Sequence, residues 1–132
     1  MVCDLDIAGK AVSLFKPGAQ INNSGPPTRQ FLDRMGAGIS NCLVVHDEID
    51  LALGQVKLKQ GGGDGGHKGL KSVIGSLGSH EIKRLRIGVR RSESARTAKS
   101  SVLQSFSRPD ETALELGVDR AVEMLLSDMT GL

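Results

Sequence analysis

A glycine-rich segment near the middle of the chain constrains the fold more than any other feature. Six of the nine residues from 61 to 69 are glycine, in the order Gly-Gly-Gly-Asp-Gly-Gly-His-Lys-Gly. Glycine is costly in backbone entropy, so folded proteins keep this density where positive φ angles or close backbone approach are required. Residues 56–59 alternate like a strand, and the apolar residues of 70–77 repeat like one helix face. The segment is therefore predicted to be a structured loop between a strand and a helix.

The length and composition bound the class of protein. The 132 residues suffice for one domain with its own core, so we predict a single domain over residues 1–132. With no Trp or Tyr and three Phe, the core is expected to be aliphatic. There is no apolar run of transmembrane length and no basic-then-apolar leader, which disfavours membrane insertion and secretion. The cytoplasm, or else an organelle matrix, is the predicted location.

The order of periodic segments predicts an α/β fold. Strands are expected at 11–16, 41–45, 56–59 and 82–89, and helices from Pro26 to about Gly36, from 70 to Gly78, and from Pro109 to about Ser127. The continuous apolar run at 41–45 favours a central strand covered on both faces. Residues 1–10 show no clear period, 21–27 read as a loop, and 90–101 as a mobile surface loop.

Apolar spacing also predicts which faces of two helices are buried. The residues predicted to be buried are Phe31, Leu32 and Met35 in the first helix, and Leu114, Val118, Ala121, Val122 and Leu125 in the last.

Four ionisable residues follow the 41–45 strand directly: His46, Asp47, Glu48 and Asp50. Ligands bind at the carboxyl ends of strands in open α/β sheets, so Asp47 is interpreted as a carboxylate that orients a histidine. Glu48 and Asp50 are interpreted as a solvated acidic turn, and His46 as a capping or packing residue. A metal site is the alternative, but adjacent strand residues point to opposite faces and do not converge on one ion. No metal ligand is predicted.

Basic residues are concentrated between 57 and 99, although the net charge is only +2. They are Lys57, Lys59, Lys68, Lys71, Lys83, Arg84, Arg86, Arg90, Arg91, Arg96 and Lys99. Two interpretations stay open: a surface that follows phosphates, or, for half of them, solubilising charges. Lys57 and Lys59 are the strongest candidates for phosphate contact, because they share one face of a strand beside the glycine loop.

A dinucleotide fingerprint is a further interpretation of the loop, because Gly61, Gly63 and Gly66 satisfy G-x-G-x-x-G. Two features disfavour it. The preceding strand carries two lysines, whereas the first strand of a Rossmann unit is buried. The acidic residue expected about twenty positions later should end the next strand, and Glu81 precedes that strand instead.

Four motifs in the same order resemble one family, the bacterial-type peptidyl-tRNA hydrolases. They are Asn-Asn-Ser-Gly at 22–25, Val-His-Asp-Glu-Ile-Asp-Leu at 45–51, the run from Lys57 to Lys71, and Arg-Leu-Arg-Ile-Gly at 84–88. The resemblance implies a mixed, mostly parallel sheet flanked by helices. It also implies hydrolysis of the ester that joins a peptide to tRNA, with tRNA as the partner, no cofactor and a monomer.

The resemblance also implies roles for individual residues. Asn22 would hold the substrate end, and Asp47 would stabilise the basic form of a catalytic histidine. The tRNA side would include Lys57, Lys59, Gly63 and Gly66. Gln20 stands where the family has an aromatic residue, and Lys68 where it has an asparagine, so the substrate there would meet an added positive charge.

The family's general base belongs to an upstream Asn-His pair, and this sequence has no histidine before His46. We therefore expect the chain to be shortened at its N-terminus, and His67 becomes the candidate replacement base. The alternatives are a relative that binds tRNA or RNA without hydrolysing the ester, and an incomplete chain.

Overall fold

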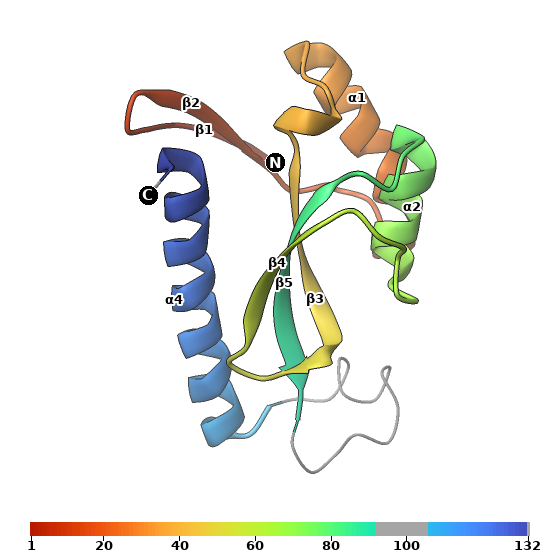
Figure 1. The fold of residues 1–132 in the computed structure, drawn as a ribbon. Helices are drawn as coiled ribbons and strands as arrows, with labels where there is room; N and C mark the ends of the chain where they lie inside the picture. The colour runs from red at the N-terminus through yellow and green to blue at the C-terminus, as the bar shows by residue number, and fades with distance from the viewer. Residues whose placement is uncertain (92–105, 132) are drawn as a thin grey trace. The chain divides into compact units, whose positions relative to one another are not determined.

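The computed structural model describes residues 1–91 and 106–131 (Figure 1). The chain divides into two compact units, each described below by itself. The first unit consists of Met1–Val44, Gln60–Lys83 and Met129–Leu132, and the second of Val45–Lys59 and Arg84–Asp128.

A β-hairpin opens the first unit. Strand β1 (Val2–Ile7) pairs antiparallel with β2 (Lys10–Phe15). The two-residue turn at Ala8 and Gly9 has positive φ at both positions, 52° and 82°, as the hairpin turns that match strand twist require. The strand predicted at 11–16 is confirmed. Strand β1 was missed because five of its six residues are exposed, so burial imposes no alternation on its sequence.

The first helix, α1, spans Gly25–Met35 and follows a short 3₁₀ helix, η1 (Ile21–Asn23). Prolines at its first positions favour this start. Proline has no backbone N–H, and at these positions an N–H would have no acceptor within the helix. The helix ends at Gly36 with φ 62°, as predicted. Leu32 is buried, but the prediction of a buried Met35 is wrong, because 53% of its surface is exposed.

The core of the first unit forms around helix α2 (Lys68–Leu77). Its four predicted apolar residues are all buried: Leu70, Val73, Ile74 and Leu77. They pack with Leu32 of α1 and with Ile82, and Cys42 and Val44 lie against this cluster. Burial raises the pKa of the Cys42 thiol, so that thiol is a packing group rather than a nucleophile.

Helices α1 and α2 approach closely at Gly25. The backbone N–H of Gly25 donates to Ser72 Oγ at 2.8 Å. A Cβ added at Gly25 would lie 2.1 Å from Ser72 O, so only glycine fits this crossing. The contact explains why a helix begins at a residue with poor helical propensity.

The sheet contains β3 (Leu43–Ala52), β4 (Val56–Gln60) and β5 (Lys83–Arg90) in the order β3-β5-β4. Strands β3 and β5 run parallel, since Glu48 pairs with Arg86 and the Leu53 N–H bonds Arg90 O. Strands β4 and β5 run antiparallel, since the Gly88 N–H bonds Gln55 O and the Gly61 N–H bonds Ile82 O. The predicted α/β fold with a mixed sheet is confirmed.

Strand β3 differs from its prediction in two ways. The central strand of the described sheet is β5, and Val45 of β3 is 49% exposed, so a strand covered on both faces at 41–45 is wrong. The strand also continues through the charged residues to Ala52 and places Asp47 inside it rather than at its end. The apolar run correctly indicates that a strand is present. The position of this strand in the sheet and the residue where it ends depend on its pairing with β5.

Helix α4 spans Arg108–Thr130 and extends three residues beyond its predicted end, and its residues up to Asp128 belong to the second unit. A Cβ added at Gly117 would lie 3.3 Å from the Gly54 Cα, and Arg120 Nη1 donates to Gly54 O at 2.7 Å. Gly117 and Ala121 therefore form the buried face. Val118 and Val122, predicted on that face, are exposed because the close backbone approach selects the small residues.

Part of the predicted loop at 90–101 lies outside the described residues, since only Arg90 and Arg91 are described and Arg90 ends β5. None of the helices within 1–91 and 106–131 combines the length and the apolar character needed to cross a membrane.

Candidate functional site

Two segments assigned to the substrate by resemblance meet at Gly69 in the first unit. Gly69 is buried, and a Cβ added there would lie 2.9 Å from Ile21 Cγ1 and 3.0 Å from His67 Cε1. The 3₁₀ helix η1 therefore packs on the first turn of α2, and Asn22 follows the contact residue Ile21 directly. Gln20 is the N-cap residue of η1, and the exposed residues of this region include Gln20, Asn22 and Lys68.

His67 is the N-cap residue of α2, and its ring has a defined hydrogen-bonding role. Its Nδ1 accepts the backbone N–H of Leu70 at 3.0 Å. An Nδ1 that accepts carries no hydrogen, so the neutral imidazole holds its proton on Nε2. In this arrangement His67 is suited to donate a hydrogen bond from Nε2, and less suited to remove a proton from water.

Removing the His67 cap is expected to destabilise the protein. His67→Ala deletes the acceptor for the Leu70 N–H and should lower the free energy of unfolding by about 1 kcal/mol. His67→Asn keeps a side-chain acceptor at the cap and should retain most of the stability. Urea unfolding of both variants measures the difference. Equal stability of the two variants would contradict a capping role.

The glycine loop has the backbone conformations that its composition predicts. Positive φ angles of 73°, 93°, 59° and 85° occur at Gly61, Gly62, Gly65 and Gly66. Asp64 organises the turn between them, because its Oδ1 accepts the Gly66 N–H at 2.8 Å and its carbonyl accepts the His67 N–H at 3.0 Å. The prediction of a structured loop is therefore confirmed. Gly63 differs, since its φ is not positive and a Cβ would have open space.

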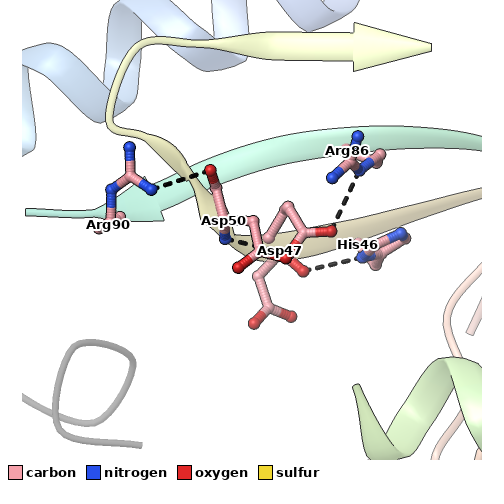
Figure 2. A network of polar contacts seen from close by, with 6 residues as sticks. His46, Asp47, Asp50, Arg86 and Arg90 are labelled. Atoms are coloured by element: carbon pink, nitrogen blue, oxygen red, sulfur yellow. Dashed lines mark hydrogen bonds and ion pairs between the residues drawn. The ribbon is translucent and has the colours of Figure 1, made fainter. Parts of the chain in front are cut away.

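A polar network surrounds Asp47 in the second unit (Figure 2). The imidazole Nδ1 of His46 contacts Asp47 O at 2.8 Å. Glu48 Oε1 pairs with Arg86 Nε at 3.1 Å, and Glu48 Oε2 accepts the Asp50 N–H at 3.1 Å. Arg90 Nη1 donates to Asp50 O at 3.0 Å. Side chains from β3 and β5 thus hold the main chain of residues 46–50.

The interpretation of Glu48 as a solvated turn residue is wrong. Its side chain is only 13% exposed, and it lies within β3 in an ion pair with Arg86. Asp50 is exposed as expected, but it belongs to the strand and not to a turn. The sequence does contain a signal for the pair, namely opposite charges on two strands that are neighbours in a parallel sheet. That signal cannot be used until the strand order is known.

The environment of Glu48 shifts its acidity. Burial raises its pKa, but hydrogen bonds from the Asp50 N–H and Arg86 and the charges of Arg86 and His46 outweigh burial, so the net pKa is lowered from 4.5. A carboxyl with a lower pKa in the folded state stabilises the fold above its unfolded pKa, and the stability is lost as pH falls through the folded value.

We therefore expect wild-type stability to decline as pH is lowered below about 4.5, with part of the decline due to Glu48. Glu48→Gln should reduce the slope of stability against pH in that range. Urea midpoints measured from pH 6 down to pH 3 test this, with Asp50→Asn as an exposed control. An unchanged slope in Glu48→Gln would contradict the assignment.

The basic residues predicted to contact phosphates differ in their exposure to solvent. Lys57 and Lys59 are exposed on β4, an edge strand of the described sheet. Arg84 is only 1% exposed, so its assignment to a phosphate-contacting surface is wrong. Arg91 lies over the Phe106 ring at 4.4 Å and pairs with Asp110 at 3.7 Å. Arg96 and Lys99 lie outside the described residues.

Comparisons with known proteins agree on one family. A family model described as peptidyl-tRNA hydrolase matches residues 1–131. The peptidyl-tRNA hydrolase of Mycobacteroides abscessus is 39% identical over 124 residues, which cover 91% of this chain and 63% of that protein. The peptidyl-tRNA hydrolase of Halalkalibacterium halodurans is 35% identical over 117 residues, covering 89% of this chain and 63% of that protein.

A solved structure supports the same assignment. The crystal structure of peptidyl-tRNA hydrolase from Acinetobacter baumannii matches with a TM-score of 0.83 and 28% identity, covering 97% of this chain and 66% of that one. The chain spans about 63% of the length of the curated relatives named above. Since the family model matches nearly every residue, the resemblance carried by the motifs is confirmed, and the chain belongs to the peptidyl-tRNA hydrolase family.

Proposed function

We propose that this chain hydrolyses the ester bond between tRNA and a peptide or N-blocked aminoacyl group. Membership of the family supports the reaction class. The observation that carries the proposal is the packing of η1 on the first turn of α2, with Ile21 against Gly69. This packing brings the Asn22 segment of the family motif to the segment that contains His67 and Lys68.

The first turn of α2 offers groups that suit an ester carbonyl. The first amides of a helix have no partner within the helix, and the helix dipole makes this end positive. Donors placed this way stabilise the negative oxygen that forms when water attacks a carbonyl. We assign Asn22 to holding the substrate end and His67 Nε2–H to hydrogen-bond donation. Lys68, at the first position of α2, adds a positive charge there.

Asp47 is assigned the carboxylate role that the resemblance implies. In the resemblance, a carboxylate beside an imidazole stabilises the form that has taken a proton from water; where no such imidazole is present, the carboxylate itself is the group that takes this proton, and either role lowers the barrier to attack. The family's upstream histidine has no counterpart among the residues before His46. His67 is the candidate to replace that histidine as base, but its engaged Nδ1 favours the donor role instead.

We assign tRNA binding to Lys57, Lys59 and the glycine loop with Gly63 and Gly66. Both lysines are exposed on an edge strand, where ammonium groups can reach phosphates and release the counterions bound to them. The proposal treats residues 1–132 as one functional domain, monomeric, acting in the cytoplasm or an organelle matrix where tRNA is present. The chemistry needs no cofactor, because water is the only co-reactant of ester hydrolysis.

Release of an acyl group tests the proposal directly. Purified protein is incubated with N-acetylated aminoacyl-tRNA carrying a labelled amino acid, and soluble label is followed against a boiled control. We expect release proportional to the concentration of protein. No release above the boiled control at high protein concentration would overturn the enzymatic function.

Binding of tRNA without hydrolysis is the second candidate function. One observation favours it: the bond from the Leu70 N–H occupies the nitrogen that His67 would need as a base. A tRNA mobility shift that weakens with salt, together with no release of label, would support this candidate. Failure of tRNA to shift the protein at low salt would overturn both functions.

A further inference from the structure

His46 and Glu48 lie on one face of β3, and Asp47 lies on the other. Consecutive side chains in a strand point to opposite faces, and all three residues are within Leu43–Ala52. Figure 2 shows the ring of His46 directed at the main chain of Asp47. The carboxylate proposed for the reaction and the imidazole next to it in sequence therefore do not share a face. The contact between these two residues that the structure shows runs from the imidazole to the main chain of Asp47.

The bond between His46 and Asp47 defines the state of the imidazole. The Asp47 carbonyl oxygen only accepts hydrogen bonds, so the contact of 2.8 Å requires that His46 Nδ1 donates. The bond ties the peptide plane between Asp47 and Glu48 to a side chain of the same strand. It restricts rotation about the backbone bond that connects the Asp47 Cα to its carbonyl.

Glu48 and Arg86 extend this restraint along the strand. Glu48 Oε2 accepts the Asp50 N–H, and Glu48 Oε1 is held by Arg86 of β5 at 3.1 Å. The two side chains are 13% and 20% exposed, so water competes weakly for these bonds. His46 is also close enough to Glu48 for its charge to act on that carboxylate. The peptide plane between Asp47 and Glu48 and the plane between Ile49 and Asp50 are thus each anchored by a bonded side chain.

We infer that His46, supported by Glu48 and Arg86, is a positioning residue for Asp47 in the proposed ester hydrolysis. The expected effect of His46 on the reaction rate rests on the proposed function. The restraint of the Asp47 main chain by His46 rests only on the geometry of β3. The His46 imidazole fixes the main chain of the strand from one face. The Asp47 carboxylate then projects from the opposite face in one orientation. A displacement of about 1 Å at a reacting group costs up to about a hundredfold in rate, so such a restraint has a measurable effect.

Kinetics of three variants test the catalytic consequence. His46→Ala removes the Nδ1 donor and should lower kcat about ten- to a hundredfold, with KM within about twofold of wild type. His46→Asn places an amide N–H₂ near the position of Nδ1 and should restore most of kcat. His80→Ala removes an exposed histidine outside the network and should leave both constants unchanged. Full kcat in His46→Ala would overturn the inference.

A double-mutant cycle separates positioning from a direct role in the chemistry. If His46 acts only through Asp47, His46→Ala should have no further effect on kcat in an Asp47→Asn background. Additive losses would overturn the positioning role. Far-ultraviolet circular dichroism and urea midpoints of all variants show whether a loss of rate comes from unfolding.

Nitrogen-15 and carbon-13 NMR test the structural content without any turnover. The ring of His46 should be protonated at Nδ1 at neutral pH, and His46→Ala should shift the carbonyl carbon resonance of Asp47. A His46 ring protonated only at Nε2, or an unchanged Asp47 resonance, would overturn the inference. If wild-type protein releases no acyl group, the proposed function fails, and these NMR signals alone decide whether His46 holds Asp47.

Discussion

Replacing Asp47 with asparagine is expected to lower kcat for release of the acyl group from N-acetylated aminoacyl-tRNA by about two to four decades. Asparagine has nearly the same shape but no negative charge, so it can neither take the proton of the attacking water nor stabilise a neighbouring base that has taken it. The loss should appear in kcat with little change in KM, because the proposal places tRNA binding on other residues. Steady-state kinetics at neutral pH measure both constants.

Asp50→Asn is the matched control for this prediction. It makes the same chemical change three residues later in β3, at an exposed side chain whose observed bonds involve its main-chain N–H and carbonyl. We expect the control to keep wild-type kcat and the same unfolding midpoint. An Asp47→Asn variant as active as this control would show that the Asp47 carboxylate has no part in the reaction.

Replacing Gly88 with alanine is expected to lower the free energy of unfolding by about 3 kcal/mol, at the upper end of overpacking costs in a filled core. Gly88 is buried in the central strand β5. A Cβ there would lie 2.1 Å from Ala52 O and 2.9 Å from Leu51 O of β3, and both atoms are main-chain atoms. Relief of the overlap requires β3 to move away from β5, which breaks bonds of the parallel pair. Urea unfolding measures the loss through the shift in midpoint.

Gly75→Ala is the control for this second prediction. Gly75 is exposed within α2, and a Cβ there would meet no atom within 4 Å. Alanine at an open helical position should raise the free energy of unfolding by about 0.5–1 kcal/mol, because it lowers the entropy of the unfolded chain. A Gly88→Ala protein as stable as wild type would contradict the close spacing of β3 and β5.

Helices were the elements best predicted from the sequence. Helix α2 was predicted with its four buried residues, because a glycine C-cap and a 3.6-residue apolar repeat are local signals. The prolines at the start of α1 and Gly36 at its end are local signals as well. The buried face of α4 was predicted less well. Its orientation depends on the approach of Gly117 to Gly54, two residues far apart in the sequence.

Strand predictions failed where pairing decided the outcome. Strand β1 carries acidic and apolar residues with little burial, and its only strand partner among the described residues is β2 across a two-residue turn. Strand β3 continues beyond its apolar run because its charged residues find partners in β5, such as Arg86 for Glu48. When the partner strand β5 is not known, the polar pattern of residues 46–50 indicates a turn.

The candidate site residues divide in the same way. Motif spacing alone singled out Asn22, Asp47 and His67, and these assignments stay predictions. The structure added the direction of each hydrogen bond, with His67 Nδ1 accepting from Leu70 and His46 Nδ1 donating to Asp47. No spacing rule gives those directions, because they depend on which backbone group lies beside each ring.

The sequence by itself determined the family, the α/β class and the glycine loop. The motifs, helix caps and positive-φ positions that specify them are written in short stretches of chain. Only the tertiary structure decided that β5 is central, that Arg84 and Glu48 are shielded from water, and that Gly25 and Gly88 lie where no side chain fits. These properties depend on contacts between residues distant in sequence, and burial and steric exclusion arise only when such segments pack together.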